Sequence, residues 1–527
     1  MIFFSYSKKL FDYNNLYYQL LILFAASLPF SNFLLTLSQI LLIANFLFNK
    51  GFVERISRII NRTVLVFLML YLMHIVGLIY SSDYNYAMKD LRIKLPLLII
   101  PIIVFTSGRI SFHKIKNILL LFSFSVLAYS IVCIIYKFIT PLENIKEPQN
   151  ISFIISHIRL SLMIAFALSI KFYFSFINDN TSKNYKLLFT FSFAWYLYFS
   201  YQLEAFTAFV LIYLLILIFS FYLLKKYYAK SYWLYTSVYS ILILAPIIFS
   251  VIQVNDFYNI KEYPKSDLTL KGNYYYNDTN VKMIENGYYV WQYICEKELK
   301  EEWNKISNIN YDSADINKNP VRFTLFRYLT SLGLKKDANG VLKLNKEDIR
   351  AIERGLANYK YKIKQPLTNR LYKIIWEFDY LFKGYNASGH SISQRYYFWT
   401  ASNEIFRNNP FIGVGTGDVD KSYNEIYSLC FSFVKKDFQL KSHNQYLRML
   451  VAFGVIGFII FIISILYPYI YTQSYKSFLA NIFLLIIFLS MISEDTIETQ
   501  TGVSLFVFFY SILILINQPI SVPKNRV

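Results

Sequence analysis

Long runs of apolar residues, separated by short polar segments, set the hydrophobic pattern of this chain. Runs of roughly 17–22 apolar residues have the length that an α-helix needs to cross a bilayer, whereas the strands of a β-barrel would be about half as long. The pattern therefore predicts an all-α integral membrane protein with about 12 transmembrane helices, over residues 15–30, 32–49, 63–80, 95–107, 117–139, 153–176, 187–202, 204–224, 234–254, 445–467, 478–493 and 502–517. The fourth run is short and carries Pro96 and Pro101, so we expect a bent or partly re-entrant helix there.

One long polar segment, 255–444, separates the ninth predicted span from the tenth. It carries 22 of the 33 acidic residues, and apolar residues at helical spacing predict amphipathic helices over 293–306 and 345–362. A connection of this length is too long to be passive, so we expect a large, mainly helical loop domain. The predicted organisation is a membrane domain of about nine spans over 1–254, the loop domain over 255–444, and a membrane domain of about three spans over 445–527.

Composition and charge support the membrane interpretation. The chain is 55% hydrophobic and only 16% charged, and its formal net charge is +20. Such a charge could suggest binding to nucleic acid, but an excess of Lys and Arg in cytoplasmic loops explains it better. We therefore expect the protein to contact membrane lipid and not to bind nucleic acid. With the N-terminus inside, the predicted inner segments carry Lys50, Arg55, Arg58, Arg62, Arg109, Lys114, Lys116, Lys183, Lys186, Lys225, Lys226, Lys230, Lys524 and Arg526, whereas the short outer loops carry Lys89, Arg92, Lys94 and Lys146. This asymmetry predicts that both termini are cytoplasmic and that the large loop is extracytoplasmic.

Two charged residues stand out within the predicted spans. Arg159, in "SHIRLSLMIAF", lies a few residues below the expected outer surface. An arginine at that depth is a candidate for function, although its long side chain could also reach the outer headgroups. Glu204, in "YQLEAFTAF", begins a span near the same face and could contact a substrate or pair with Arg159 or a lysine.

The end of the long polar segment holds a third candidate cation. In "HSISQRYYFWTASNEIFRNNPFIGVGTGD" (390–418), Arg395, Phe398 and Ser402 share one face of a predicted helix. The planar guanidinium could grip a phosphate group, or it could pair with a nearby surface acid. The stretch "GVGTGD" (413–418) has no Lys-Ser/Thr after its glycines, so we interpret it as a turn and not as a phosphate-binding loop.

Polar residues also mark the boundaries of the last spans. In "SHNQYLRMLVAFGVIG" (442–457), His443 and Asn444 precede the tenth span, and Arg448 follows about one turn later. A histidine can take a proton from a hydroxyl near neutral pH, or it can serve as a helix cap or interfacial hydrogen-bonding group. In "SEDTIETQTG" (493–502), three acids lie between two spans, where they could bind a cation, orient a base or stay solvated: Glu494, Asp495 and Glu498.

These motifs together resemble the O-antigen ligase and polymerase superfamily of bacterial envelope proteins. Its pattern is an Arg, an aromatic helix, a "P-hydrophobic-hydrophobic-G-x-G-x-G" turn, then "H-N-x-x-L" and "G-hydrophobic-hydrophobic-G" at the start of a span. The chain has these elements in that order, as Arg395, Trp399, Pro410, Gly413, Gly415, Gly417, His443, Asn444, Leu447, Gly454 and Gly457.

The resemblance implies an inverting glycosyltransferase without metal or other cofactor, in the bacterial inner membrane with its large loop in the periplasm. Its donor would be a glycan on undecaprenyl diphosphate, and its acceptor a sugar or lipid A-core hydroxyl. The expected catalytic residues are Arg159 and Arg395, which would hold the diphosphate, and His443, which would serve the acceptor hydroxyl or orient the diphosphate. The expected substrate-binding residues are Arg448, Asn444, Glu494, Asp495 and Glu204. Whether the chain acts as ligase or polymerase stays open.

The chain departs from the family pattern at one point. Many members carry an arginine just before the span that corresponds to 204–224, but here the sequence reads "SYQLEAFTA". Arg448 or Lys94 could replace that cation. The alternative function is a multi-pass transporter or flippase of lipid-linked or anionic substrates, for which inverted repeats and paired broken helices would be typical. The sequence contains no recognisable inverted repeat.

Overall fold

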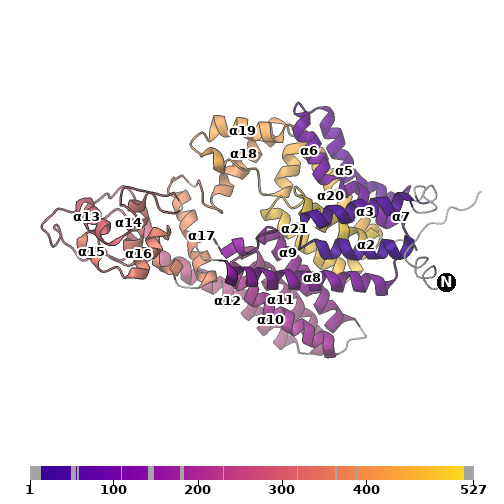
Figure 1. Cartoon of the computed structure of the whole chain (residues 1–527), viewed down its shortest axis with the longest axis horizontal. Coiled ribbons are helices and arrows are strands. Elements are labelled where there is room, and N and C mark those ends of the chain that lie inside the picture. Colours follow the sequence, from indigo (N-terminus) through magenta and orange to yellow (C-terminus); the bar gives the residue numbers. More distant parts are fainter. Residues whose placement is uncertain are drawn as a thin grey trace, which may run out of the picture. The chain divides into compact units, whose positions relative to one another are not determined.

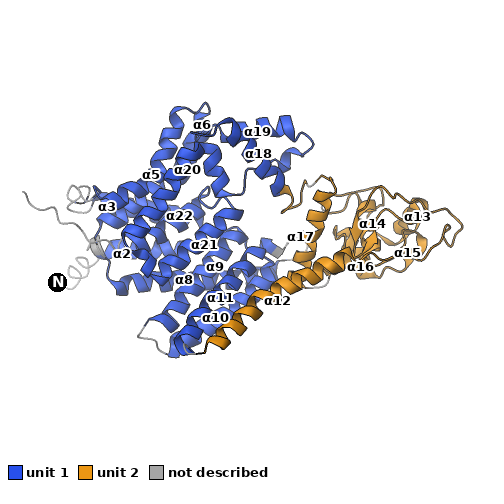
Figure 2. Ribbon diagram, turned by 180° about the vertical axis from the view of Figure 1, so that it is seen from behind, with its two compact units in different colours: residues 1–230, 395–527 blue, residues 231–394 orange. Residues whose placement is uncertain are grey.

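A computed structural model describes residues 13–515, except for 49–54, 56–58, 109, 141–147, 179–182, 229–230, 317, 363–364 and 387. The chain forms two compact units (Figure 2), which we call the membrane unit (1–230 with 395–527) and the cap unit (231–394). These boundaries differ from the expected ones in two places. The ninth predicted span belongs to the cap unit, and residues 395–444, expected in the loop domain, belong to the membrane unit.

Within the described residues, every predicted span overlaps a helix. In chain order these are α2 (Tyr13–Ser27), α3 (Asn32–Phe48), α5 (Arg62–Ile79), α7 (Pro96–Thr106), α8 (Phe112–Ile139), α9 (His157–Phe172), α10 (Lys183–Leu203), α11 (Phe206–Tyr227), α12 (Tyr232–Tyr258), α20 (Gln445–Tyr471), α21 (Phe478–Ser493) and α22 (Gln500–Tyr510). Within the described residues, six of these helices are long and apolar enough to cross a membrane: α5, α8, α9 with the π-helical turn η3 (Tyr173–Ile177), α11, α12 and α20. The structure is thus that of a helical membrane protein, and the number of spans remains a prediction.

Helices α9 and α22 lie inside the membrane unit: α9 packs against α8 and α21 (Figure 1), and every residue of α22 from Thr501 to Tyr510 is buried. Every residue of α9 from Leu160 to Phe172 is buried, and α8, α10, α11 and α21 pack around this helix. A helix that is apolar on all sides is expected to lie inside a bundle. Stacked rings join α9 to its neighbours, and the Phe172 and Phe219 centroids are 3.9 Å apart. This packing uses several of the 49 phenylalanines of the chain.

Helix α20 is broken at Gly454, where φ is 61°. The residues after α18 (Gln394–Asn408) pair with the break: Val455 N donates to Pro410 O at 2.8 Å, and Gly415 N donates to Ala452 O at 2.8 Å. Helices in a membrane can break where other parts of the protein satisfy the freed backbone groups. A Cβ on Gly413 would lie 2.4 Å from the backbone of Ala452, so a glycine is required for this close approach. The "GVGTGD" stretch is a turn, as expected, and it docks into the broken helix.

The cap unit contains α12, a two-stranded antiparallel sheet and a group of short helices. The strands are β1 (Ile284–Glu285) and β2 (Tyr288–Tyr289), and the helices are α13 (Glu296–Ile306), α14 (Val321–Ser331), α15 (Ala338–Leu342), α16 (Lys346–Glu353), η4 (Tyr359–Lys362) and α17 (Pro366–Phe382). The helix expected over 345–362 was predicted too long, because α16 ends before Gly355, whose φ of 79° cannot continue a helix. Trp303, Leu325 and Ile352 are fully buried in the core of this unit.

Candidate active site

The loop between α21 and α22 organises a cluster of charged residues at one end of the membrane unit. Its three acids are engaged with partners rather than simply solvated. Asp495 Oδ1 accepts hydrogen bonds from the backbone N of Asn444 at 3.0 Å and from Ser442 Oγ at 3.1 Å. These two contacts join the loop to the residues that flank His443. The chain positions 442–444 and 495 are therefore held together although about fifty residues separate them.

His443 lies between this loop and α18. Its Nδ1 is 3.8 Å from Glu494 Oε2, an ion-pair distance, and its ring packs against Phe398 with centroids 5.6 Å apart. The backbone of His443 is left-handed, with φ 45°, which is uncommon outside glycine. About a third of the side chain is exposed. The interaction with Glu494 raises the pKa of His443, and Asp495 adds to this effect, whereas burial and Arg395 oppose it.

Two arginines approach the same group of residues. Arg395 Nη2 donates to the carbonyl oxygen of Ser493 at 3.0 Å, and its charge acts on His443. Arg159, at the start of α9, interacts electrostatically with Glu494 and Asp495. Its Nε is buried and has no hydrogen-bond partner among the described residues. The structure thus brings together Arg159, Arg395, His443, Glu494 and Asp495 from four separate segments of the chain.

A buried ion cluster lies beside this group. Lys94, the last residue of α6 (Tyr84–Lys94), donates to Asp90 Oδ1 at 2.7 Å and to Glu498 Oε2 at 2.8 Å. Arg448 Nε lies 3.6 Å from the same Glu498 oxygen, and Gln445 Nε2 donates to Glu498 Oε1 at 3.0 Å. Although burial favours the neutral acid, Lys94 and Arg448 hold the pKa of Glu498 well below its usual range. Glu498 is therefore the point at which α6 and α20 hold the loop between α21 and α22.

Two expected substrate-binding residues, Asn444 and Arg448, have partners within the protein. The Asn444 side chain caps α20 by accepting from Tyr446 N and Leu447 N. Arg448 is 3% exposed and also donates to Tyr86 Oη at 2.8 Å, so its guanidinium lies inside the protein. Glu204 lies in the turn between α10 and α11 with a left-handed φ of 52°.

A lysine lies next to the segment in which many family members carry the arginine that this chain lacks. Gln202, near the end of α10, accepts a hydrogen bond from Lys137 Nζ at 2.8 Å. Lys94 and Arg448, the residues considered as replacements, both interact with Glu498 instead. Sequence reasoning passed over Lys137, although a lysine in the last turn of the predicted span 117–139 was a visible signal. It also passed over Lys171 in α9, which is 2% exposed and donates to Ser192 Oγ at 2.8 Å.

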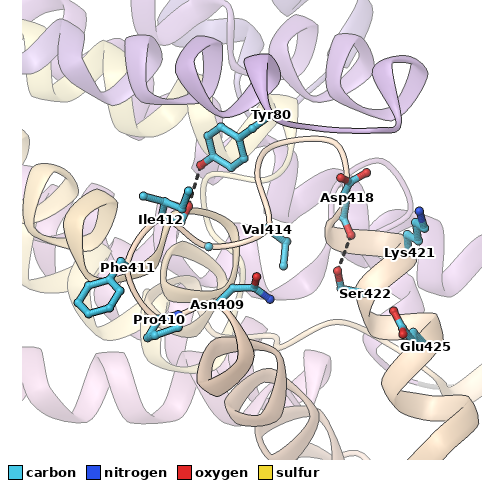
Figure 3. A pocket seen from close by; sticks show the side chains of 11 residues that line it. Tyr80, Asn409, Pro410, Phe411, Ile412, Val414, Asp418, Lys421, Ser422 and Glu425 are labelled. Carbon is cyan, nitrogen blue, oxygen red and sulfur yellow. Dashed lines mark hydrogen bonds between the residues drawn. The ribbon is translucent and has the colours of Figure 1, made fainter.

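A cavity of about 570 Å³ lies beside the turn that docks into α20 (Figure 3). Tyr80, residues 409–414 and helix α19 (Val419–Cys430) line it, and Tyr80 Oη donates to Ile412 O at 2.7 Å. Asp418, at the edge of the cavity, accepts from Ser82 N at 2.8 Å and from Asp83 N at 3.0 Å. These bonds hold the pKa of Asp418 below its usual range, although burial opposes them. Asp418 thereby fastens the turn to the segment that joins α5 to α6.

Replacing Asp418 with alanine is expected to lower the free energy of unfolding by about 1–2 kcal/mol, because two backbone N–H groups lose a charged acceptor. Since the folded protein depresses the pKa of Asp418, its stabilisation is present above the unfolded pKa and is lost as the pH falls through the folded pKa. Thermal unfolding at neutral and acidic pH checks both statements. Glu425→Ala, at an exposed position that lines the same cavity, is the matched control. Equal unfolding temperatures for the two variants would contradict this role of Asp418.

The fold and the cluster define a polytopic helical membrane protein with a charged, partly exposed site at the helix ends. A family model described as O-antigen ligase matches residues 187–462, just over half of the chain, and the match includes Arg395 and His443. The chain therefore belongs to the O-antigen ligase family, as its motifs predicted. A comparison with curated proteins gave no match. Membership indicates a glycosyltransferase-type membrane enzyme that uses a lipid-linked glycan donor and a glycan acceptor.

Proposed function

We propose that the protein transfers a glycan from undecaprenyl diphosphate to a sugar or lipid A-core hydroxyl at the outer leaflet of the bacterial inner membrane. The observation that supports this most strongly is the convergence of Arg159, Arg395 and the His443–Glu494 pair at one end of the membrane unit. Two guanidinium groups suit a diphosphate, and a histidine that is ion-paired through Nδ1 suits proton transfer at Nε2. The orientation of the chain in the membrane rests on the charge asymmetry of its loops.

The proposed reaction needs little acid catalysis, because a diphosphate is a good leaving group. The acceptor oxygen bonds to the anomeric carbon from the face opposite the diphosphate, so the configuration inverts. The bond between the anomeric carbon and the diphosphate oxygen breaks, and its electron pair leaves with the diphosphate. His443 Nε2 takes the proton of the acceptor hydroxyl, and Glu494 stabilises the resulting imidazolium. Arg159 and Arg395 stabilise the charge that develops on the leaving group.

Lys137 is our candidate for the cation that replaces the missing arginine. It lies in the last turn of α8, and its hydrogen bond to Gln202 places it at the segment where the family pattern has that residue. Unlike Lys94 and Arg448, it is not part of the Glu498 ion cluster. We assign it to the binding of the donor diphosphate together with the two arginines.

The pH dependence of the reaction distinguishes the two roles left open for His443. A base must be neutral, so transfer should rise with pH through a pKa above the ordinary histidine value, since Glu494 raises it. Glu494→Gln removes that charge, so the rising limb of the kcat/KM profile should move to lower pH. Activity that instead falls as the pH rises through this range would assign His443⁺ to holding the diphosphate.

A cellular experiment tests the proposed function against transport. In cells that lack the protein, lipid-linked glycan should accumulate at the outer leaflet, where an added glycosidase reaches it after the outer membrane is permeabilised. Loss of a flippase would instead leave the lipid-linked glycan on the inner side, protected from the enzyme. In α20, backbone groups freed by the break are paired with the 410–415 turn.

A further inference from the structure

The cap unit has a hollow of its own, of about 530 Å³. Its lining combines aromatic rings with polar and charged side chains, among them Asn273, Tyr274, Tyr276, Trp291, Glu296 and Lys297. All of these residues belong to the cap unit, whereas the residues of the candidate active site belong to the membrane unit. The proposed chemistry uses none of them. The hollow therefore needs an explanation of its own.

The backbone fixes which tyrosines face the hollow. Tyr274 and Tyr276 form bridges with Leu268 and Ile294 in an extended stretch, so alternate side chains point to opposite sides. Tyr275 points inward, where its hydroxyl bonds to Asp337 and its ring packs against Tyr293. Tyr274 and Tyr276 remain 81% and 59% exposed. Two large rings on the same side of this stretch are thus exposed to solvent, and contiguous exposed apolar surface is typical of a binding site.

The polar groups around these rings limit the chemistry of a ligand. Glu296 and Lys297, the first two residues of α13, are exposed and carry opposite charges, so they add no net charge to the hollow. A phosphate or diphosphate would require an excess of cations. The Asn273 amide is held at the edge by Glu298, to which its Nδ2 donates at 2.7 Å. Flat rings beside fixed polar groups suit a ligand that has one apolar face and many hydroxyls.

We propose that this hollow binds a segment of glycan chain, with sugar rings stacked on Tyr274 and Tyr276 and with hydroxyls bonded to Asn273, Glu296 and Lys297. This inference rests on the proposed function in one respect: it takes the bound glycan to be the chain that the protein transfers. A second site on the cap unit would bind one part of the growing or transferred chain while the reactive end of the same chain is in the candidate active site. It would raise the effective concentration of long chains over short ones.

The test measures binding by the full-length protein in nanodiscs, without any lipid-linked donor. The probe is a set of oligosaccharides released by mild acid from the surface polysaccharide of the source cells, and intrinsic fluorescence reports the Kd. Tyr274→Ala is expected to weaken binding at least about tenfold, and Tyr276→Ala should do the same. Phe382→Ala is the matched control, because this aromatic residue of the cap unit is 82% exposed and does not line the hollow. Inorganic diphosphate should not compete.

The outcomes separate this inference from the proposed function. Equal affinities for the wild type and the tyrosine variants, or no binding by the wild type, would overturn the inference. Competition by inorganic diphosphate would also overturn it, since the hollow would then be an anion site. Binding that depends on Tyr274, in a protein that forms no glycosidic bond under any condition, would keep the glycan site and reject the transferase.

Discussion

Replacing His443 with alanine will lower the rate of glycan transfer at least about a hundredfold and leave the protein folded. The expected size follows from the contribution of a positioned general base, about 10²–10⁴-fold. The histidine can have this effect because Glu494 pairs with its Nδ1 and because the contacts of Asp495 with Ser442 and Asn444 fix the backbone on either side. Release of undecaprenyl diphosphate from the donor, followed for purified protein, measures the rate.

Two further variants separate chemistry from folding in this experiment. His443→Asn keeps a residue type that tolerates the left-handed backbone at φ 45°, so it should lose activity without a loss of thermal stability. His113→Ala, at an exposed position near the start of α8, should keep wild-type activity. Equal turnover by the wild type and both His443 variants would contradict the assignment of His443 while leaving the enzyme itself intact.

Replacing Glu498 with alanine will lower the free energy of unfolding by about 3–5 kcal/mol, which is the usual effect of removing one partner from a buried ion pair. The change leaves the buried cations Lys94 and Arg448 without their shared carboxylate, and these side chains are 2% and 3% exposed. It also releases the loop that carries Glu494, so the rate of glycan transfer should fall together with the free energy of unfolding. The midpoint of thermal unfolding in detergent measures the first effect.

The matched control for Glu498 is Glu404→Ala. Glu404 pairs with Arg407 at 3.3 Å, but both side chains are exposed, and such pairs contribute less than about 1 kcal/mol. A similarly small shift for both variants would show that the Glu498 cluster does not hold the membrane unit together. Glu498→Gln should be intermediate, because the amide oxygen can still accept a hydrogen bond from Lys94.

The helices of this protein could be predicted from its sequence, since burial in lipid or in the bundle demands long apolar runs. Each of the twelve predicted spans overlaps a helix within the described residues, from α2 to α22. The expected domain boundaries differed from the compact units, because the polarity of 395–444 resembles that of a soluble loop although these residues pack in the membrane unit. Amphipathic spacing likewise extended the helix at 345–362 past Gly355, where the backbone requires a turn.

The candidate site could be predicted only in part. The sequence points to His443 because it stands at a span boundary, to Arg159 because it lies within a span, and to Arg395 because its guanidinium lies on one face of a predicted helix. The structure brings all three near Glu494 and Asp495. The Glu498 cluster could not be foreseen, because Lys94 and Glu498 are separated by 404 positions and no local pattern joins them. The sequence predicts that Arg448 contacts the substrate, because its position near a span boundary does not reveal its partners. In the structure Arg448 is buried against Glu498 and Tyr86, and these tertiary contacts leave no local pattern in the sequence.

The proposed function requires that the purified wild-type protein forms a glycosidic bond, and this can be measured directly. Proteoliposomes would receive undecaprenyl-diphosphate glycan and candidate sugar or lipid A-core acceptors, and mass spectrometry would follow the product and the lipid carrier. We expect one undecaprenyl diphosphate to be released for each new bond, with inverted configuration at the transferred sugar. Folded protein that moves the lipid-linked glycan across the bilayer without forming any glycosidic bond would overturn the proposed transfer and establish a transporter.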